Sequence, residues 1–485
     1  MPAETRIPLR VIFHGSRGSF LAALLLAELA AAMQGIAYTT VLPVIANDLD
    51  GYALFGATLA AGTVSAVLML GFSAPILARV RPGTVLLAAT VLYVVGAAAC
   101  VFAPTMVVVL IGSLVRGIAG GLMGGFGMGA IGGLFDERER PRVMGLFAFV
   151  WLLPSLVGPA LNGVITEFAG WRWAIGWPAI AVVVARIFMG TAVRAIPWRR
   201  RHEPVRPVAG LVVTGCLALG AWGSAASGPW AIAAFAVGVA GAAAAIVVFL
   251  LRGAAAARVL ITFAILCAAF FGAYELLSLA VIEGFSFTVV WAAGVLMAGL
   301  IAWSIAGLRP RPDARPDRVI VGIALAVVAT VALAVTVATA SGLVAIALSV
   351  SAAGLAGWGM GLAYPLLSTE PFALSASAST AGALIAFAET AGTAWAALLG
   401  GGLYSALHTA GWMPRPSLAL VYSVFALTGV AGLLLALRRR RGHVPPHRAD
   451  LADSLPDVDA QGRGEVGGEQ LDLPRREGGT AQPGG

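Results

Sequence analysis

Apolar residues form runs of about twenty or more along most of this chain, separated by short polar turns. A helical run of that length crosses the roughly 30 Å hydrocarbon layer of a bilayer, because each helical residue adds about 1.5 Å. The pattern therefore predicts about fourteen membrane-spanning helices. They cover residues 19–46, 53–78, 84–103, 105–134, 143–166, 173–194, 208–226, 229–251, 258–282, 286–307, 318–340, 342–366, 378–403 and 416–437.

The polar turns alternate between arginine-rich and arginine-poor segments. Positively charged loops stay on the cytoplasmic side of a membrane. The alternation therefore predicts an even number of spans with both chain ends in the cytoplasm, and the segment 368–380 is the one inner loop without arginine. The arginine-rich segments are the N-terminus, 78–82, 136–142, 194–206, 252–258, 307–318 and 438–441.

The composition supports a membrane protein and argues against other classes. Of 485 residues, 59% are hydrophobic and 11% are charged, whereas a soluble domain carries roughly 25% charged residues. The net charge of +8 comes from arginines in loops, not from a groove that would bind nucleic acid. Cys100, Cys216 and Cys267 lie in apolar segments without metal-binding or disulfide spacing, so we predict no metal site and no cofactor.

The chain also repeats its own organisation. Two six-span halves, 19–194 and 258–437, each have an arginine-bearing loop after the second span. Residues 195–257 hold a cytoplasmic loop and two linker spans, residues 1–18 a cytoplasmic N-terminus, and residues 438–485 a disordered cytoplasmic tail. The expected fold is an all-α integral membrane protein of two six-helix bundles in pseudo-twofold arrangement.

Glycines recur at every fourth position in the fourth span, at Gly117, Gly121, Gly125, Gly129 and Gly133. This spacing places them along one helix face, where a neighbouring backbone can approach closely. A dinucleotide-binding loop would require a preceding strand, and none is predicted. We interpret the row as a helix-packing surface.

The fifth span contains the segment WLLPSLVGPALNG, in which Pro154 and Pro159 alternate with Gly158 and Gly163. An interior proline removes a helical hydrogen bond, and in lipid the freed carbonyl must find a partner in a neighbouring helix or a water-filled cavity. These four residues are therefore the expected conformational hinge, in a bent helix that packs against a partner.

Ionisable residues inside spans are the candidates for proton coupling. A charge at the bilayer centre costs at least about 2.5–3.5 kcal/mol. An acid at that depth therefore favours its protonated form, and it can load and release a proton near neutral pH. Glu389, Glu28, Glu275 and Arg116 are predicted proton-coupling residues, although each acid also fits a neutral hydrogen-bonding role and Arg116 a structural ion pair. For Arg186, the simplest expectation is a side chain that extends to the cytoplasmic surface.

Aromatic and amide side chains near the expected midplane are candidates for lining a substrate cavity. An amide in lipid requires a hydrogen-bonding partner, and an aromatic ring can contact an apolar substrate. Simple packing or anchoring at the membrane surface is the alternative for each. These candidates are Gln34, Tyr38, Trp151, Asn162, Tyr274 and Trp395.

Several segments resemble one known family. LPSLVGPALNG resembles the GxxxGPxxGG signature in the fifth helix of major facilitator superfamily antiporters, with Pro154 at the first glycine and Asn162 at the penultimate one. LVRGIAGG resembles their fourth-helix RxxxG signature. YTTVLPVIANDL and GWRW resemble segments of the fourteen-spanner drug:proton antiporters, and GLAGWGMGLAYPLLST a GxGMG run of actinobacterial members. The resemblance covers about residues 19–437.

The chain departs from that family at two motifs. Gln34 stands where the first helix usually has an acidic residue. The loop after the second span reads APILARVRPG, with Ala78 at the usual aspartate and Arg81 at a usual glycine, while Arg79 matches. We retain Arg79 and Arg81 as the counterpart of the family's cytoplasmic-loop motif.

The resemblance implies a secondary active transporter that works by alternating access and exports amphipathic or hydrophobic compounds in exchange for protons. It implies that Arg116 takes part in proton coupling and that the fifth-helix bend packs against its counterpart in the other half. The expected location is a bacterial cytoplasmic membrane. The expected partners are a small hydrophobic or amphipathic substrate, protons and lipid, and the protein is expected to be a monomer.

Other functions remain open at this point. The same fold carrying a lipid or a metabolite is the nearest alternative, and the missing first-helix acid favours it. A membrane enzyme acting on lipid-linked substrates would need a paired catalytic site, but the five histidines are scattered, so we predict no enzymatic activity. A receptor or scaffold is a third alternative. No GxxxxGK[ST] segment is present for ATP-driven transport.

Overall fold

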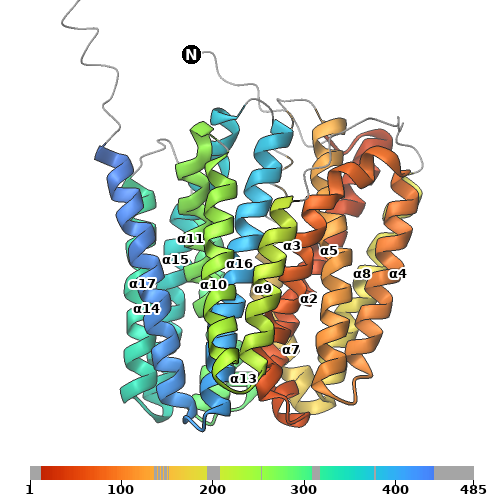
Figure 1. Ribbon diagram of the computed structural model, residues 1–485. Helices are drawn as coiled ribbons and strands as arrows, with labels where there is room; N and C mark the ends of the chain where they lie inside the picture. The colour runs from red at the N-terminus through yellow and green to blue at the C-terminus, as the bar shows by residue number, and fades with distance from the viewer. Residues whose placement is uncertain are drawn as a thin grey trace, which may run out of the picture. The chain divides into compact units, whose positions relative to one another are not determined.

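The fold is known from a computed structural model that describes residues 12–135, 139, 143, 146, 150, 152–193, 208–252, 254–308, 317–375 and 378–441. These residues form fourteen long helices and no strand (Figure 1). Twelve of the helices are long and apolar enough to span a membrane, and the remaining two contain shorter apolar stretches. The predicted all-α membrane fold is therefore confirmed, with one helix for each predicted span.

The helices of the first half are α2 (Gly15–Asp48), α3 (Phe55–Arg79), α4 (Pro82–Val101), α5 (Met106–Leu134), α7 (Leu152–Ala169) and α8 (Trp171–Val193), with the short helix η1 (Tyr52–Leu54) before α3. The linker helices are α9 (Val208–Ala225) and α10 (Pro229–Leu251). The second half contains η2 (Ala254–Ala256), α11 (Ala257–Glu275), α12 (Leu277–Leu279), the π-helical turn η3 (Ala280–Gly284), α13 (Val289–Leu308), α14 (Asp317–Thr339), α15 (Gly342–Leu374), α16 (Ala378–Thr409) and α17 (Pro414–Arg441).

The packing of the first half recurs in the second. Helix α5 packs on α3 and α4 as α15 packs on α13 and α14, and α2 packs on α7 as α11 packs on α16. Between the halves, α3 packs on α16 and α7 on α13. These two contacts are equivalent, since each joins the second helix of one half to the fifth of the other. All of these helices belong to one unit, Met1–Arg440.

The linker helices cover one of the two seams between the halves. Helix α9 packs on α3 and α16, and α10 packs on α9, α11 and α16 (Figure 1). Thr214 of α9 donates a hydrogen bond to the Val64 carbonyl of α3 at 3.5 Å. Trp395 of α16 donates to the Val239 carbonyl of α10 at 2.9 Å. The linker pair thus contacts both halves.

Glycines allow the fourth helix of each half to cross its neighbours at close range. A Cβ on Gly117 of α5 would lie 2.0 Å from the Gly62 carbonyl oxygen of α3, and one on Gly357 of α15 would lie 1.9 Å from the Gly299 carbonyl oxygen of α13. A side chain does not fit at either crossing. The structure thus confirms the helix-packing role of Gly117 and shows that the second half uses the same arrangement.

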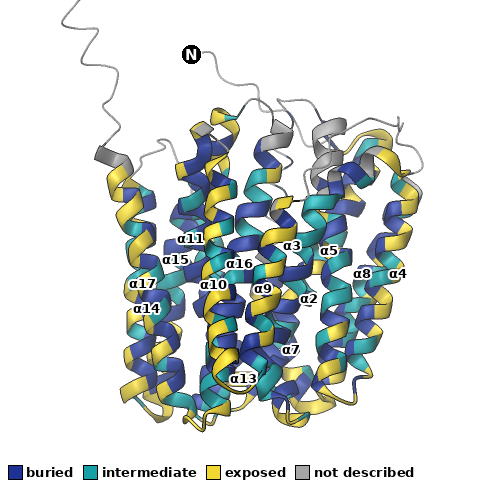
Figure 2. Cartoon of the chain, in the orientation of Figure 1, coloured by how far each residue is buried: buried dark blue, intermediate teal, exposed yellow. Residues whose placement is uncertain are grey.

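Exposed residues lie along many of the helices (Figure 2), and a large number of them carry large apolar side chains. Phe168, Trp230 and Leu427 are 85%, 81% and 70% exposed. Exposed apolar surface of this extent is unfavourable in water and favourable against lipid chains. It agrees with the low proportion of charged residues in the sequence.

Two features of the helices differ from the expected spans. The ninth span is interrupted after Glu275, where α11 gives way to α12 and η3. Helix α15 has 33 residues, about 50 Å at 1.5 Å per residue, so it extends well beyond a bilayer's hydrocarbon core. Hydropathy identifies only the part of a helix that contacts lipid, so the predicted span 342–366 is shorter than α15. The tail expected from residue 438 lies outside the described residues beyond Arg441.

Candidate functional site

Two of the predicted acids, one from each half, lie within electrostatic range of each other. Glu389 of α16 accepts a hydrogen bond from the hydroxyl of Tyr364 of α15, at 2.9 Å. Glu28, on α2 of the first half, lies close enough to interact electrostatically with both Glu389 and Tyr364. Together, Glu28 and Glu389 form what we call the carboxyl pair, and each half of the molecule contributes one member.

Aromatic rings hold Tyr364 in place beside this pair. The Tyr364 ring meets Phe263 of α11 edge-on at 5.1 Å and Trp303 of α13 at 5.4 Å between ring centroids. Cys267 of α11 is fully buried and within electrostatic range of Glu389. Because rings from two neighbouring helices, α11 and α13, pack against the tyrosine ring, its hydroxyl is positioned toward Glu389 without much freedom to turn away.

Glu275, the third predicted acid, lies at the break in the ninth span. It is the last residue of α11, and its Oε2 is buried without a hydrogen-bond partner among the described residues. Three residues later, the Ser278 hydroxyl donates to the Thr39 carbonyl of α2 at 2.5 Å. The helix break therefore packs against the first half, and the Glu275 carboxyl group has no described contact with the carboxyl pair.

Arg116 lies inside the first half, on α5. Its guanidinium carbon is 3.8 Å from the centroid of the Tyr38 ring of α2, an arrangement typical of a cation–π contact. Its Nη1 is 4.0 Å from the Cys100 sulfur of α4, and its Nε is buried without a partner among the described residues. No described carboxylate pairs with it, so the ion pair considered as an alternative is not seen there.

Gln34, which occupies the position of the family's first-helix acid, is fully engaged within the first half. Its Nε2 donates to the Ile175 carbonyl of α8 at 3.2 Å, and its Oε1 accepts from the Tyr93 hydroxyl of α4 at 2.9 Å. Arg186 of α8 lies 4.8 Å from the Tyr93 ring and donates to the Ala89 carbonyl. Arg186 is 7% exposed, so the expectation that it extends to the membrane surface is wrong.

Loss of the Tyr93 hydroxyl should destabilise the first half. In Tyr93→Phe, the buried Gln34 Oε1 would lose its donor, which costs about 1–3 kcal/mol. We expect a lower melting temperature in a thermal unfolding assay of the purified protein. Tyr422→Phe is the matched control, because the buried Tyr422 hydroxyl has no partner among the described residues. Equal melting temperatures for the two variants would contradict the role given to Tyr93.

The expected hinge lies in α7, with Pro159 in the helix interior and Pro154 near its first described turn. A Cβ on Gly158 would lie 3.1 Å from Ile36 of α2, and one on Gly163 would lie 2.9 Å from the Ala293 Cβ of α13. The two glycines therefore serve opposite sides of α7, one within the first half and one across the seam. The helix that α7 meets across the seam is α13. Helix α16, which is the counterpart of α7 in the second half, packs on α3 instead.

Asn162 lies between these glycines and is fully buried. Its Oδ1 accepts a hydrogen bond from Trp177 Nε1 of α8 at 3.1 Å, and its Nδ2 has no partner among the described residues. The Thr166 hydroxyl donates to the Asn162 carbonyl at 2.6 Å. The amide therefore joins α7 to α8 through its oxygen, while its NH2 group has no partner among the described residues.

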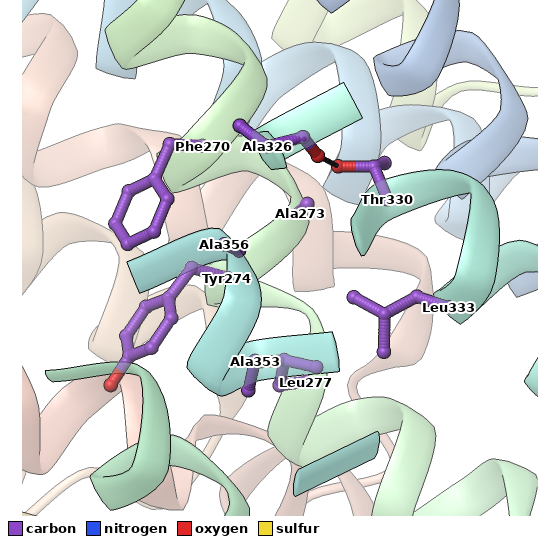
Figure 3. Close-up of a pocket in the computed structure, with 9 residues that line it drawn as sticks. All are labelled: Phe270, Ala273, Tyr274, Leu277, Ala326, Thr330, Leu333, Ala353 and Ala356. Atoms are coloured by element: carbon purple, nitrogen blue, oxygen red, sulfur yellow. Dashed lines mark hydrogen bonds between the residues drawn. The ribbon is translucent and has the colours of Figure 1, made fainter. Parts of the chain in front are cut away.

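Tyr274 lines a small apolar pocket within the second half (Figure 3). Its ring stacks on Phe270 with centroids 5.6 Å apart, and its hydroxyl donates to the Leu296 carbonyl at 2.8 Å. The pocket offers little polarity, since the Thr330 hydroxyl is already bonded to Ala326. The lining residues are Phe270, Ala273, Tyr274, Leu277, Ala326, Thr330, Leu333, Ala353 and Ala356.

The remaining candidates are dispersed. Trp395 contacts linker helix α10 through its indole nitrogen, and Trp151 lies outside the described residues. Arg79 ends α3 and Arg81 precedes α4, and both are exposed. Their cavity and loop roles stay predictions. The described residues include no cluster of three His, Cys, Asp or Glu side chains for a metal ion.

Comparison with known proteins identifies the family. The model of the Major Facilitator Superfamily matches residues 24–398, which is most of the chain. The chain belongs to the Major Facilitator Superfamily. The match extends from the first span to the thirteenth, so both members of the carboxyl pair lie within the conserved superfamily fold.

Superfamily members of known or assigned type are similar to parts of the chain. The multidrug transporter protein MdtP of Bacillus subtilis is 23% identical over 209 residues, which are 42% of this chain and 38% of that protein. The multidrug efflux pump SdrM of Staphylococcus aureus is 26% identical over 151 residues, or 31% of this chain and 34% of that protein. The chain thus matches only about a third of the length of these curated relatives.

Solved transporter structures share the fold. A POT family transporter in complex with 5-aminolevulinic acid has a TM-score of 0.63 at 13% identity, covering 86% of this chain and 96% of that chain. The human organic anion transporter MFSD10 has a TM-score of 0.59 at 14% identity, covering 87% and 100%. At these identities the likeness concerns the arrangement of helices alone.

Sequence reasoning missed the partners of its own candidates. Tyr364 was not a candidate, although it precedes Pro365 in the span before Glu389. Tyr93, which holds Gln34, carried no signal apart from being a tyrosine within an apolar span. In both cases the partner lies on another helix, and a single sequence gives no direct indication of which helix faces overlap.

Proposed function

We propose that this superfamily member is a secondary active transporter that exchanges protons for amphipathic or hydrophobic compounds by alternating access. The observation that carries the proposal is the carboxyl pair, in which Glu389 is held by a hydrogen bond from Tyr364 and lies within electrostatic range of Glu28 of the opposite half. The multidrug relatives support the substrate class, since MdtP and SdrM are described as multidrug proteins.

The carboxyl pair offers a physical link between proton binding and movement of the halves. Two nearby carboxylates repel when both are ionised, and the repulsion is stronger in a medium of low dielectric constant. A proton on either acid removes the repulsion and favours approach of α2 to α16. Loss of the proton favours their separation. Tyr364 keeps Glu389 oriented through this cycle.

Arg116 and the α7 glycines have supporting roles in this proposal. Arg116 stacks on Tyr38 of α2, so a displacement of α2 is transmitted to α5. Gly163 brings α7 close to α13, so the two backbones can slide at the seam that the linker helices leave uncovered. Replacing Pro159 with Ala would stiffen α7 and should slow transport more than it lowers expression, as measured by uptake per molecule of purified protein.

In this proposal, the transporter works as a monomer in a bacterial cytoplasmic membrane, and residues 19–194 and 258–437 are its two moving bundles. The alternation of arginine-rich loops supports a cytoplasmic location for both termini. Protons and a small apolar molecule are its partners, and no cofactor is required by this mechanism.

Transport by purified protein in liposomes tests the proposal. With an imposed pH gradient, vesicles that contain the protein should accumulate the lipophilic dye ethidium faster than empty vesicles, and a protonophore should abolish the difference. Absence of both gradient-driven uptake and dye counterflow would refute proton exchange of this substrate class. Gradient-independent counterflow of a lipid or metabolite would instead favour the alternative cargo.

A further inference from the structure

The short helix η1, which follows the C-terminal end of α2, contacts the second half. Tyr52, in η1, donates a hydrogen bond from its hydroxyl to Oε1 of Glu283 at 2.5 Å. Glu283 belongs to the π-helical turn η3, beyond the break in the ninth span. A residue of the first half is therefore joined directly to a carboxyl group of the second.

Two side chains of α16 form the walls around the Tyr52 ring. The ring centroid of Tyr52 lies 5.0 Å from that of His408 and 6.5 Å from that of Tyr404. Phe55, one turn after Tyr52, meets Tyr404 edge-on at 6.0 Å. The first half thus presents two aromatic rings to one strip of α16. We call Tyr52, Glu283, Tyr404 and His408 the η1 cluster.

The backbones of the halves are also in contact beneath the η1 cluster. The Gly56 amide donates to the Ser405 hydroxyl at 3.0 Å. A Cβ on Gly56 would lie only 2.2 Å from the Gly401 carbonyl carbon. Side chains and water have no room between α3 and α16 here, so the halves are closed against each other at this end.

Unusual backbone flanks both sides of the hydrogen bond. Among the described residues, Asp50 and Ser286 are the two non-glycine residues with positive φ, at 46° and 60°. Asp50 precedes Tyr52 by two positions, and Ser286 follows Glu283 by three. Such conformations and π-helical turns are unfavourable unless the surroundings hold them, and they concentrate at segments that switch between states.

We propose that the η1 cluster is a latch, in which the Tyr52–Glu283 hydrogen bond holds this end of the transport passage closed. Tyr52 must leave the space between Glu283, Tyr404 and His408 before the passage opens at this end. The inference rests on the proposed alternating access. It adds the residues that set the balance between the closed and open states. These lie in η1, in η3 and in the last turns of α16, away from the carboxyl pair.

The latch can be tested by measuring the distance between the halves at this end. Asn47 and Ala410 are exposed, one in each half, and would be changed to cysteine for spin labels after Cys100, Cys216 and Cys267 are replaced by alanine. Double electron–electron resonance on the full chain in lipid nanodiscs then gives the ratio of long to short distances. In Tyr52→Phe this ratio should rise about tenfold, as expected from loss of a hydrogen bond to a charged group.

Tyr404→Phe is the matched control, since it removes a hydroxyl from the same cluster that has no hydrogen-bond partner among the described residues. Its distance distribution should equal that of the parent. Glu283→Ala should shift the distribution in the same direction as Tyr52→Phe, and it provides a second test if one variant does not fold.

An unchanged distribution in both Tyr52→Phe and Glu283→Ala would overturn the latch. An equal shift in Tyr404→Phe would also overturn it, because general loosening of the cluster would then explain the effect. Ethidium uptake by the parent protein separates this result from the proposed function. If the parent transports ethidium and the variants show an unchanged distance distribution, the latch alone is refuted. If the variants show a shifted distribution and the parent does not transport ethidium, the proton-exchange proposal alone is refuted.

Discussion

Replacement of Glu389 by Gln is expected to stop gradient-driven ethidium uptake while ethidium binding persists. Glutamine has nearly the same shape and can still accept the hydrogen bond from Tyr364, but it cannot exchange a proton. We expect uptake driven by a pH gradient to fall by about a hundredfold, at the lower end of what a positioned proton-transfer group contributes. Uptake into proteoliposomes and equilibrium dye binding measure the two properties separately.

Glu167→Gln provides the control for this substitution, since Glu167 is exposed on α7 and should be dispensable. Glu28→Gln should also impair driven uptake, because the remaining acid no longer experiences a neighbouring charge that depends on protonation. Normal driven uptake by Glu389→Gln would remove that residue from the coupling mechanism, whatever the behaviour of the control.

Valine at Gly117 or at Gly357 is expected to destabilise the protein strongly. The new Cβ would lie about 2 Å from a carbonyl oxygen of α3 or α13, at 2.0 and 1.9 Å respectively. Because the obstacle is backbone, the helices must move apart, at a cost of at least about 1–3 kcal/mol. We expect each variant to lower the melting temperature by several degrees in a thermal unfolding assay of purified protein.

Gly120→Val and Gly354→Val are the controls within the same two helices. A Cβ at either position would meet nothing within 4 Å, so these variants carry the same helix-propensity penalty without the collision. If they lowered the melting temperature as much as Gly117→Val and Gly357→Val, the penalty would come from valine in the helix and not from the crossing. A lower melting temperature in only one of Gly117→Val and Gly357→Val would contradict the claim that both halves use the same packing.

The number of helices follows from the sequence because lipid imposes a simple length requirement. Each apolar run had to form a complete helix, since a backbone in hydrocarbon must satisfy its own hydrogen bonds. The Gly117 row also revealed a packing face, because only a missing side chain permits so close an approach. The break after Glu275 gave no such signal, as Leu276 and Leu277 are ordinary helix formers.

The pairing of side chains could not be obtained in this way. A helix in lipid is apolar on all sides, so hydropathy does not show which face meets a neighbour. Gln34 and Asn162 were alike as amides in apolar spans. Both amide atoms of Gln34 have a partner, whereas the Asn162 nitrogen has none among the described residues. The approach of Glu28 to Glu389 depends on how the two halves meet, which the sequence of either span does not encode.

Proton release on ethidium binding tests most directly whether the carboxyl pair couples protons to substrate. The purified protein, in weakly buffered detergent solution, should release protons when ethidium is added, because a cation that enters near Glu28 and Glu389 displaces the proton they hold. The double variant Glu28→Gln, Glu389→Gln should bind the dye and release none. Proton release from this double variant equal to that of the unmodified protein would contradict the assignment.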